Sequence, residues 1–500
     1  MCIAADQMSS LRRQNRGIRS QLRSIAARGR CQAGIPSVLG GLVLVVLTGC
    51  VDYQAAPLEP RHSADQFAAR RLDEAQLRDD LMRLMPEAAA SWPPQQWDRG
   101  ELLAVALVRN PGLAVAQAQV QAALAHQITA GETPNPVLTL QSEYGAHQEM
   151  HPWLYGISID WLLRSPGRRR LEQEIARLDT TNMRLQFMDQ TWGLRHSLTA
   201  ALSDWEGSRR RLVLLEQLAA AQDRLLVLER KRVQAGEDSP AELVTAEQAR
   251  IEIDQQQAQL RAEVDTAQVA AAKTMGFPPN TLDGMTFTWP DWGVPPPVSE
   301  EKRSEAREQA LLSRNDLGAA IGDYAIAETQ LKLAVARQYP QFNLGPGYYW
   351  DHGIAKFPFD VSFTLPVNRN RGEIAEARAA RDLAGKRMLA LQADIYGEVA
   401  SAERAEHLAR ASTDAAERQL EAARRQVERS NLSLRLGASD VQEQLAAQIV
   451  ALRAELEVLQ MRAQLQSARN TLEDVLHAPL SGPELALTKS ADTLLPRAGS

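Results

Sequence analysis

Four short segments of the chain have the pattern of β-strands. The clearest is 153–163, in which every second residue is large and apolar. These residues are Trp153, Tyr155, Ile157, Ile159 and Trp161. Segments 341–350 and 357–366 alternate in the same way, and we expect 136–145 to pair with 153–163. A period of two predicts strands with one apolar face.

Long stretches between these segments have a helical pattern instead. No proline interrupts Gly167 to Ser239 or Gly372 to His477. At 1.5 Å per residue, 168–235 would reach on the order of 100 Å. A coiled-coil seam runs through Leu445, Ile449, Leu452, Leu456 and Leu459. Further helices are expected at 100–130 and about 303–338.

The same landmarks occur twice along the chain, in the same order and at a nearly constant offset. "RNPGL" at Arg109 is echoed by "RNDL" at Arg314, and "SPGRRR" by "NRNRGE". "QAGEDSPAEL" is matched by "RLGASDVQEQ", and Pro279 by Pro479. We interpret this as an internal duplication. Each repeat, 98–280 and 301–480, reads helix, strand, turn, strand, very long helix, turn, helix.

Composition agrees with a mainly helical protein. The 500 residues are 44% hydrophobic and 24% charged, aromatic residues make up 5%, and the net charge is −6. The length allows two or more domains. The mild acidity, without a basic face, gives no basis for nucleic-acid binding.

The first fifty residues indicate export rather than fold. A basic lead-in is followed by the apolar run Ile35–Leu47 and by "LTGC", which ends at Cys50. This ending resembles a bacterial lipobox, so we expect residues 1–49 to be a lipoprotein signal peptide and Cys50 to be acylated, including by palmitate. An ordinary signal peptide with a chance cysteine is the alternative, and Met8 rather than Met1 can be the true start. Val51, not Asp, follows the cysteine, which favours the outer membrane of a Gram-negative bacterium.

The strand lengths match those of transmembrane strands. About ten residues each fit the ~9–11 residues that a tilted strand needs to cross a bilayer. Four strands cannot close a barrel, and lipid does not tolerate an open sheet edge. We therefore expect several copies to share one barrel. A soluble four-stranded sheet packed on the helices is the alternative.

The whole plan resembles the TolC family of outer-membrane factors. The likeness covers about residues 97–480 and rests on the duplicated order of "ELLAVALVRNPGL", "TPNPVLTL", "SPGRRRLEQEIARLD", "FDVSFTLPVNRNRGEIAEARAAR" and the two glycine turns. The resemblance implies a homotrimer with a 12-stranded β-barrel and a long α-helical periplasmic tunnel. It also implies a periplasmic adaptor protein, an inner-membrane pump and outer-membrane lipid as partners.

The two glycine turns join helices into hairpins. Ser239 can cap the helix after Gly236, with Pro240 in its first turn and Glu242 closing a capping box. Ser439 and Gln442 would repeat the device after Gly437. In the family these turns lie at the periplasmic end and contact the adaptor. By resemblance, the adaptor contacts are Gly236, Asp238, Ser239, Gly437, Ser439 and Asp440.

The family's tunnel constriction is typically acidic. Glu242 and Glu443 each stand six residues after a turn glycine. The resemblance implies that one of them forms a three-fold acidic ring at the channel gate. Glu443 is the better candidate, because Glu242 has the competing capping role.

Basic residues cluster where the first long helix begins, at Arg164, Arg168, Arg169 and Arg170. Positive charge at a helix start opposes the helix dipole. We hypothesise that anionic lipid headgroups compensate it. An exposed arginine cluster tolerated in water is the alternative.

No catalytic motif is present, so we expect a protein that is not an enzyme and has no cofactor. His147, Met150, His151 and His352 are expected in extracellular loops. Solvated loop residues are the default there, and we assign no metal site.

The proposed cargo depends on the branch of the family. "GISIDWLLRSPGRRR" and "LPVNRNRGEIAEARA" look most like the cobalt–zinc–cadmium branch, which implies the exit duct of an RND-type heavy-metal efflux system. Multidrug efflux and type I secretion are alternatives. A lipid-anchored periplasmic coiled-coil scaffold without a pore is an alternative of another class.

Three segments complete the expected organisation. Residues 50–97 form a lipid-anchored linker with one short helix, and 281–300 a Pro- and Trp-rich linker between the repeats. Beyond Pro479 the chain is short and polar, and we expect the tail, 481–500, to be loose.

Overall fold

The computed structural model describes residues 53–85, 92–146 and 150–485. The chain divides after Ser63, and helix α4 (Pro60–Ala68) begins at the end of the first unit. The described part of that unit is exposed to solvent. Cys50 lies outside the described residues. All that follows concerns the second unit, Ala64–Ser500.

The second unit is mainly helical, as predicted. Its helices are α5 (Ala75–Leu84), α6 (Arg99–Arg109), α7 (Pro111–Gly131), α8 (Pro166–Ala235), α9 (Pro240–Met275), α10 (Glu300–Ser313), α11 (Asn315–Ala336), α12 (Arg371–Arg435) and α13 (Val441–Leu476). The 70 residues of α8 correspond to about 100 Å of helix. α8 packs along α9 and α12 along α13, so each pair forms a long hairpin. No helix among the described residues is long and apolar enough to cross a membrane.

Two helices that we expected to be continuous are each broken in two. The first breaks at Asn110, whose side chain accepts a hydrogen bond from Leu113 N–H while Pro111 opens α7. Proline cannot donate to the preceding turn, so the helix restarts there. The second break is at Arg314, which binds the Asp316 carboxylate with both Nε and Nη2, at 3.1 and 2.7 Å. The predictions of single helices over 100–130 and 303–338 were therefore wrong at these two residues.

The predicted strands form one antiparallel sheet. It contains β2 (Val137–Tyr144), β3 (Trp153–Leu163) and β5 (Phe342–Asp351) in that order. β6 (Ile354–Lys356) and β7 (Phe359–Phe363) both pair with β5, so the expected strand 357–366 starts earlier, is interrupted before β7 and ends sooner. Pro358, which has no N–H to donate to the ladder, lies in the interruption.

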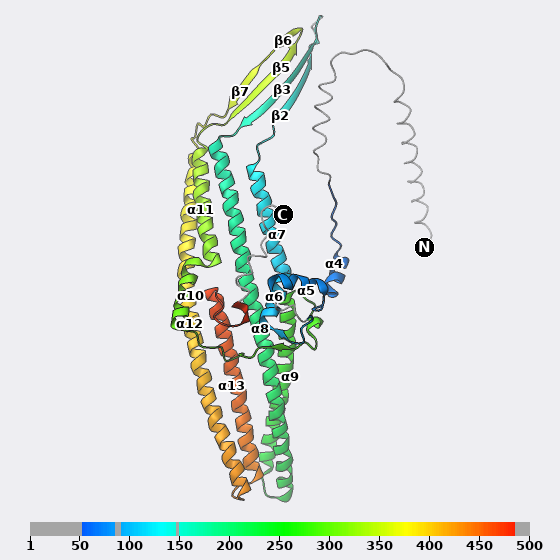
Figure 1. The fold of residues 1–500 in the computed structure, drawn as a ribbon, viewed down its shortest axis with the longest axis vertical. Coiled ribbons are helices and arrows are strands. Elements are labelled where there is room, and N and C mark those ends of the chain that lie inside the picture. The colour runs from blue at the N-terminus through cyan, green and yellow to red at the C-terminus, as the bar shows by residue number, and fades with distance from the viewer. Residues whose placement is uncertain (1–52, 86–91, 147–149, 486–500) are drawn as a thin grey trace, which may run out of the picture. The chain divides into compact units, whose positions relative to one another are not determined.

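One face of this sheet is apolar across all its strands. The register places Leu140 opposite Ile157 and Ile157 opposite Tyr348, and Leu344 opposite Val361. Leu344 is half-buried, but the others are exposed, with 72% for Leu140, 44% for Ile157 and 51% for Val361. A sheet packed on the helices by this face would have buried them. Figure 1 shows the sheet beyond one end of the helices and the two hairpin turns at the other.

Parts of both expected linkers belong to the hydrophobic core. β1 (Trp97–Asp98) pairs in parallel with β4 (Phe287–Thr288), which joins the two linkers directly. Trp292 is 1% exposed and its indole donates to the Ser203 carbonyl on α8 at 3.2 Å. Leu102, Leu198 and Leu202 complete this hydrophobic centre. The linkers therefore brace the middle of the helices.

Candidate functional site at the helical hairpin ends

The turn between α8 and α9 is closed by a left-handed glycine. Gly236 has φ +76°, and Glu237 N–H donates back to the Arg232 carbonyl at 2.9 Å. A residue with a Cβ would be strained in this conformation. Ser239 caps α9 as expected, but it accepts from Ala241 N–H at 3.2 Å. The expected capping box with Glu242 is not formed.

The turn between α12 and α13 differs from our prediction. Gly437 has φ +70°, but the N-cap is Asp440, which accepts from Glu443 N–H at 2.9 Å. Ser439 Oγ is buried and has no hydrogen-bond partner among the described residues. Gln442 donates to Glu229 Oε1 on α8 at 2.8 Å instead of completing a cap. The predicted Ser439–Gln442 device was wrong because aspartate caps equally well one residue later.

Arg232 connects the two hairpin ends. Its guanidinium binds both carboxylate oxygens of Asp238 in its own hairpin. Nη1 also lies 3.5 Å from Asp440 Oδ2 of the other hairpin. The hydrogen bond from Arg232 holds the pKa of Asp238 below its ordinary value, against the effect of desolvation. Two predicted adaptor contacts, Asp238 and Asp440, are thus held on one arginine.

Behind this arginine lies a buried carboxylate. Glu229 is 4% exposed, and ligand oxygens of Glu229, Asp238 and Glu242 lie within 4.8 Å of one another. Burial, followed by the negative charges of Asp238 and Glu242, raises the pKa of Glu229. Glu242 is therefore part of an acidic cluster, whereas Glu443 is exposed at the start of α13. The gate role of both residues stays a prediction.

Sequence reasoning missed Arg232 and Glu229. Both lie in the last two turns of α8, three residues apart and therefore on one helix face. The sequence did contain a signal for them, namely a charged pair at this spacing just before a turn glycine. This signal does not reveal that Asp440 and Gln442 of the other hairpin would also bind these two residues.

The arginines at the start of α8 bind other helices. Arg168 donates to the carbonyls of Ala336, at 3.2 Å, and Tyr339, and Arg169 donates to the Gly131 carbonyl. These carbonyls lie at the ends of α11 and α7, where helix dipoles are negative. Arg168 is 8% exposed, so the headgroup hypothesis is wrong for it. Arg164 pairs with Glu172 at 3.1 Å, and Arg170 is exposed.

A buried ionic network links the two halves of the chain. Arg195 on α8 binds Glu473 on α13 and Glu484 beyond it, and Glu484 also pairs with Arg99 on α6 at 2.8 Å. Glu484 is 1% exposed. The expectation of a loose tail was therefore wrong up to residue 485, because this carboxylate is drawn into the core by two guanidinium groups.

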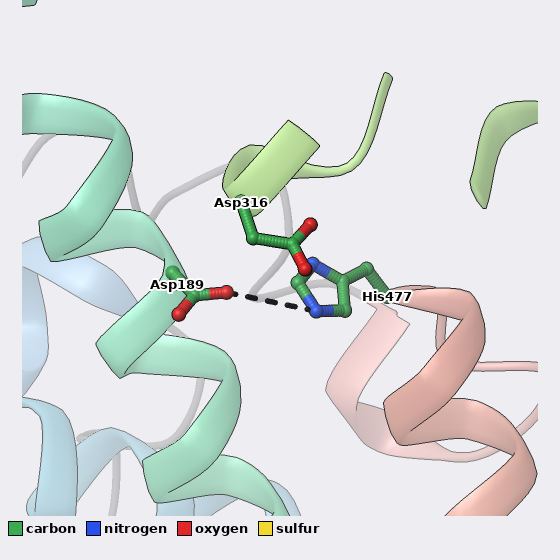
Figure 2. A group of neighbouring side chains, drawn as sticks. All are labelled: Asp189, Asp316 and His477. Carbon is green, nitrogen blue, oxygen red and sulfur yellow. Dashed lines mark ion pairs between the residues drawn. The ribbon is translucent and has the colours of Figure 1, made fainter. Parts of the chain in front are cut away.

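A second charged cluster lies at the junction of α8, α11 and α13 (Figure 2). It consists of Asp189, Asp316 and His477. His477 ends α13 with φ +47°, and its ring stacks on Trp192 with centroids 5.5 Å apart. Burial and the positive charge of Arg314 lower the pKa of His477 to about 4.

The histidines expected in the loops between strands do not form such a cluster among the described residues. His147 lies outside the described residues and Met150 is 83% exposed. His352 Nδ1 lies 2.5 Å from Asp351 Oδ1, and His151 lies beside Gly353. Among the described residues, neither histidine joins a group of three possible metal ligands.

Several solved structures have a similar fold. CusC, whose structures concern folding and transmembrane channel formation, aligns with TM-score 0.62 and 18% identity over 78% of this chain and 95% of that one. The outer-membrane channel OprN aligns with TM-score 0.63 and 18% identity over 86% and 99%. The MtrE outer-membrane channel of Neisseria gonorrhoeae aligns with TM-score 0.61 and 17% identity over 77% and 89%. These likenesses show the fold.

Sequence comparison gives the family. A search of curated proteins found no match to this sequence. The model of the outer membrane efflux protein family matches residues 102–276 and 306–476, which together make up more than half of the chain. The chain belongs to the outer membrane efflux protein family.

Proposed function

We propose that this protein is the outer-membrane exit duct of a tripartite RND-type efflux system and that heavy-metal cations are its cargo. In this proposal three copies contribute four strands each to a closed 12-stranded barrel. The helices form the periplasmic tunnel, and the hairpin ends meet a periplasmic adaptor that leads to an inner-membrane pump.

The observation that carries the proposal is the sheet. Among the described residues, β2 pairs only with β3, while β6 and β7 pair only with β5. The sheet therefore has two unpaired edges and an exposed apolar face that includes Tyr155, at 51%, and Phe359, at 63%. Open edges cannot exist in lipid, and a large apolar face is unfavourable in water. Edge-to-edge closure with other copies in a bilayer satisfies both demands.

The test of the duct is assembly followed by conductance. The full chain, purified from outer membranes in mild detergent, should run as a trimer that dissociates on heating and should form ion-conducting pores in planar bilayers. Gly156→Val is the test variant, because a Cβ at this position would lie 2.2 Å from Tyr349 Cε1 and disturb the β3–β5 pairing. Gly193→Val on α8, where a Cβ would meet nothing within 4 Å, is the matched control.

The same experiment separates the duct from its alternative of another class. A stable, trimeric intact protein without pores would leave the lipid-anchored scaffold as the better reading. If the wild-type protein were monomeric with intact helices, the proposal of a closed barrel would be wrong.

The proposal for the cargo rests on the local likeness of residues 156–170 and 365–379 to the cobalt–zinc–cadmium branch. A deletion strain should become sensitive to zinc, cobalt or cadmium, and the intact gene should restore growth. Sensitivity to dyes and antibiotics alone would assign the protein to multidrug efflux. A defect in secreted protein alone would favour type I secretion.

Lipid attachment at Cys50 is a separate part of the proposal. The sequence "LTGC" supports it. Labelled palmitate should be incorporated into the wild-type chain and not into Cys50→Ala. Equal labelling of both proteins would show that Cys50 is not the site of lipid attachment. It would not contradict the proposal that the protein is an exit duct.

A further inference from the structure

The cluster of Asp189, Asp316 and His477 combines three side chains from three helices that are distant in sequence. Asp189 lies on α8, Asp316 in the first turn of α11, and His477 at the end of α13. One ligand atom of each lies within 4.8 Å of the others. Figure 2 shows the two carboxylates and the imidazole turned towards one another.

The imidazole makes no hydrogen bond in the described structure that would account for its position. Nδ1 is buried and has no hydrogen-bond partner, and Nε2 lies 3.7 Å from Asp189 Oδ1, too far for a hydrogen bond. The His477 side chain is only 12% exposed. Leaving a buried polar atom without a hydrogen-bond partner costs free energy. The ring is stacked on Trp192, and this contact leaves the hydrogen-bonding capacity of both ring nitrogens unused.

The carboxylates differ in how they are held. Asp316 is fixed by Arg314, which also donates to the Val475 carbonyl near the end of α13 at 2.9 Å. Arg314 therefore keeps Asp316 and the end of α13 in a fixed relation. Asp189 has no ion-pair partner among the described residues other than His477, and its side chain is 45% exposed. A cation arriving from solvent would reach Asp189 first.

We propose that Asp189, Asp316 and His477 bind a divalent transition-metal cation that fastens α8 to the ends of α11 and α13. One imidazole and two carboxylates are a ligand set that suits zinc, with water completing a tetrahedral shell. Zn–N and Zn–O bonds of about 2.0–2.2 Å require only small side-chain rotations from separations within 4.8 Å. Arg314, bound to one carboxylate, supplies the outer hydrogen bonds that orient such ligands. This site is independent of the cargo proposed above, because it lies in the helical part of one chain.

Zinc titration of the full chain tests the site. The purified protein in detergent is treated with chelator, dialysed and titrated with Zn²⁺ by calorimetry, with the melting temperature followed in parallel. We expect one saturable site per chain and a rise in melting temperature as the site fills, since a ligand that binds only the folded state stabilises it.

The variants are His477→Asn and Asp189→Asn. Asparagine tolerates the left-handed backbone of residue 477, and residue 189 is half-exposed, so both chains should fold. Each should lose more than about tenfold in zinc affinity. His407→Asn, at an exposed position of α12, is the matched control and should bind as the wild type does. Wild-type-like affinity in both test variants, or no binding by the folded wild-type chain, would overturn the proposal.

Discussion

Arg232 Nη1 lies 3.5 Å from Asp440 Oδ2, although 208 positions separate the two residues. This contact joins the ends of the two helical hairpins. The Asp440 side chain is 54% exposed, so solvent screens the pair. Exposed ion pairs of this kind contribute little to stability, so an incoming partner can replace this one. The hydrogen bond from Gln442 to Glu229 also joins the two ends, so loss of this ion pair alone should loosen them without separating them.

Asp440→Asn should loosen the hairpin ends without unfolding α13. Asparagine caps a helix about as well as aspartate, so the hydrogen bond from Glu443 N–H is kept while the charge is lost. We expect a higher single-channel conductance with an unchanged melting temperature. Glu421→Gln, an exposed change on α12, is the control. Conductance equal to that of the wild type would show that this ion pair does not restrict the channel.

Glu229→Gln should stabilise the hairpin end at neutral pH. The raised pKa of Glu229 means that its ionisation costs more in the folded chain, so stability falls as pH rises from the ordinary value of 4.5 through the raised pKa. Glutamine carries no charge and still accepts the hydrogen bond from Gln442.

The measurement for Glu229→Gln is melting temperature against pH. The variant should melt higher than wild type at pH 7, and the difference should disappear below about pH 4.5. Glu216→Gln, exposed on the same helix, should show no such pattern. A lower melting temperature at pH 7 would mean that the charge of Glu229 is needed, as it would be for a resident cation.

Arg195→Met should destabilise the fold strongly. It leaves Glu473 and Glu484, both almost fully buried, with one fewer guanidinium partner each. Breaking a buried ion pair from one side costs about 3–5 kcal/mol. Heat dissociation and proteolysis of the purified protein measure the effect. Arg224→Met, at an exposed position of α8, should cost less than about 0.5 kcal/mol. Similar losses of stability in the two variants would show that the buried network does not stabilise the fold.

Low pH should also destabilise the fold near this network through Glu406, which pairs with Arg469. Burial acts to raise the pKa of this carboxyl, but hydrogen bonds from Arg303 and Arg410 and the charge of Arg469 outweigh it, and the pKa lies below its ordinary value. A lowered carboxylate pKa contributes stability above the unfolded value of 4.5, and this stability is lost as pH falls through the folded value.

Glu406→Gln isolates that acid dependence. The variant should be less stable than wild type at pH 7, because Arg469 is 1% exposed and loses a charged partner. Its stability should then fall less steeply than that of the wild type below pH 4.5. Parallel pH profiles of the two proteins would exclude Glu406 as a source of acid sensitivity.

Local sequence patterns were sufficient to predict several secondary-structure elements. Alternation predicted the strands, because successive side chains on a strand point to opposite faces and one face of this sheet is apolar. Gly236 and Gly437 marked the hairpin turns, because a left-handed residue after a helix favours glycine. The proline-free helical stretch 168–235 predicted α8 to within two residues at its start.

The contacts between distant elements could not be predicted from such local patterns. Arg168 was expected to seek headgroups and instead binds the end of α11, while Glu484 was expected in a loose tail and is buried against Arg195 and Arg99. A charged residue has the same local signature on a solvated face and in a buried pair, because its partner comes from a distant part of the chain. The contact of Arg232 with Asp440, and the cluster around His477, arise for the same reason: helix packing brings together residues that the sequence keeps far apart.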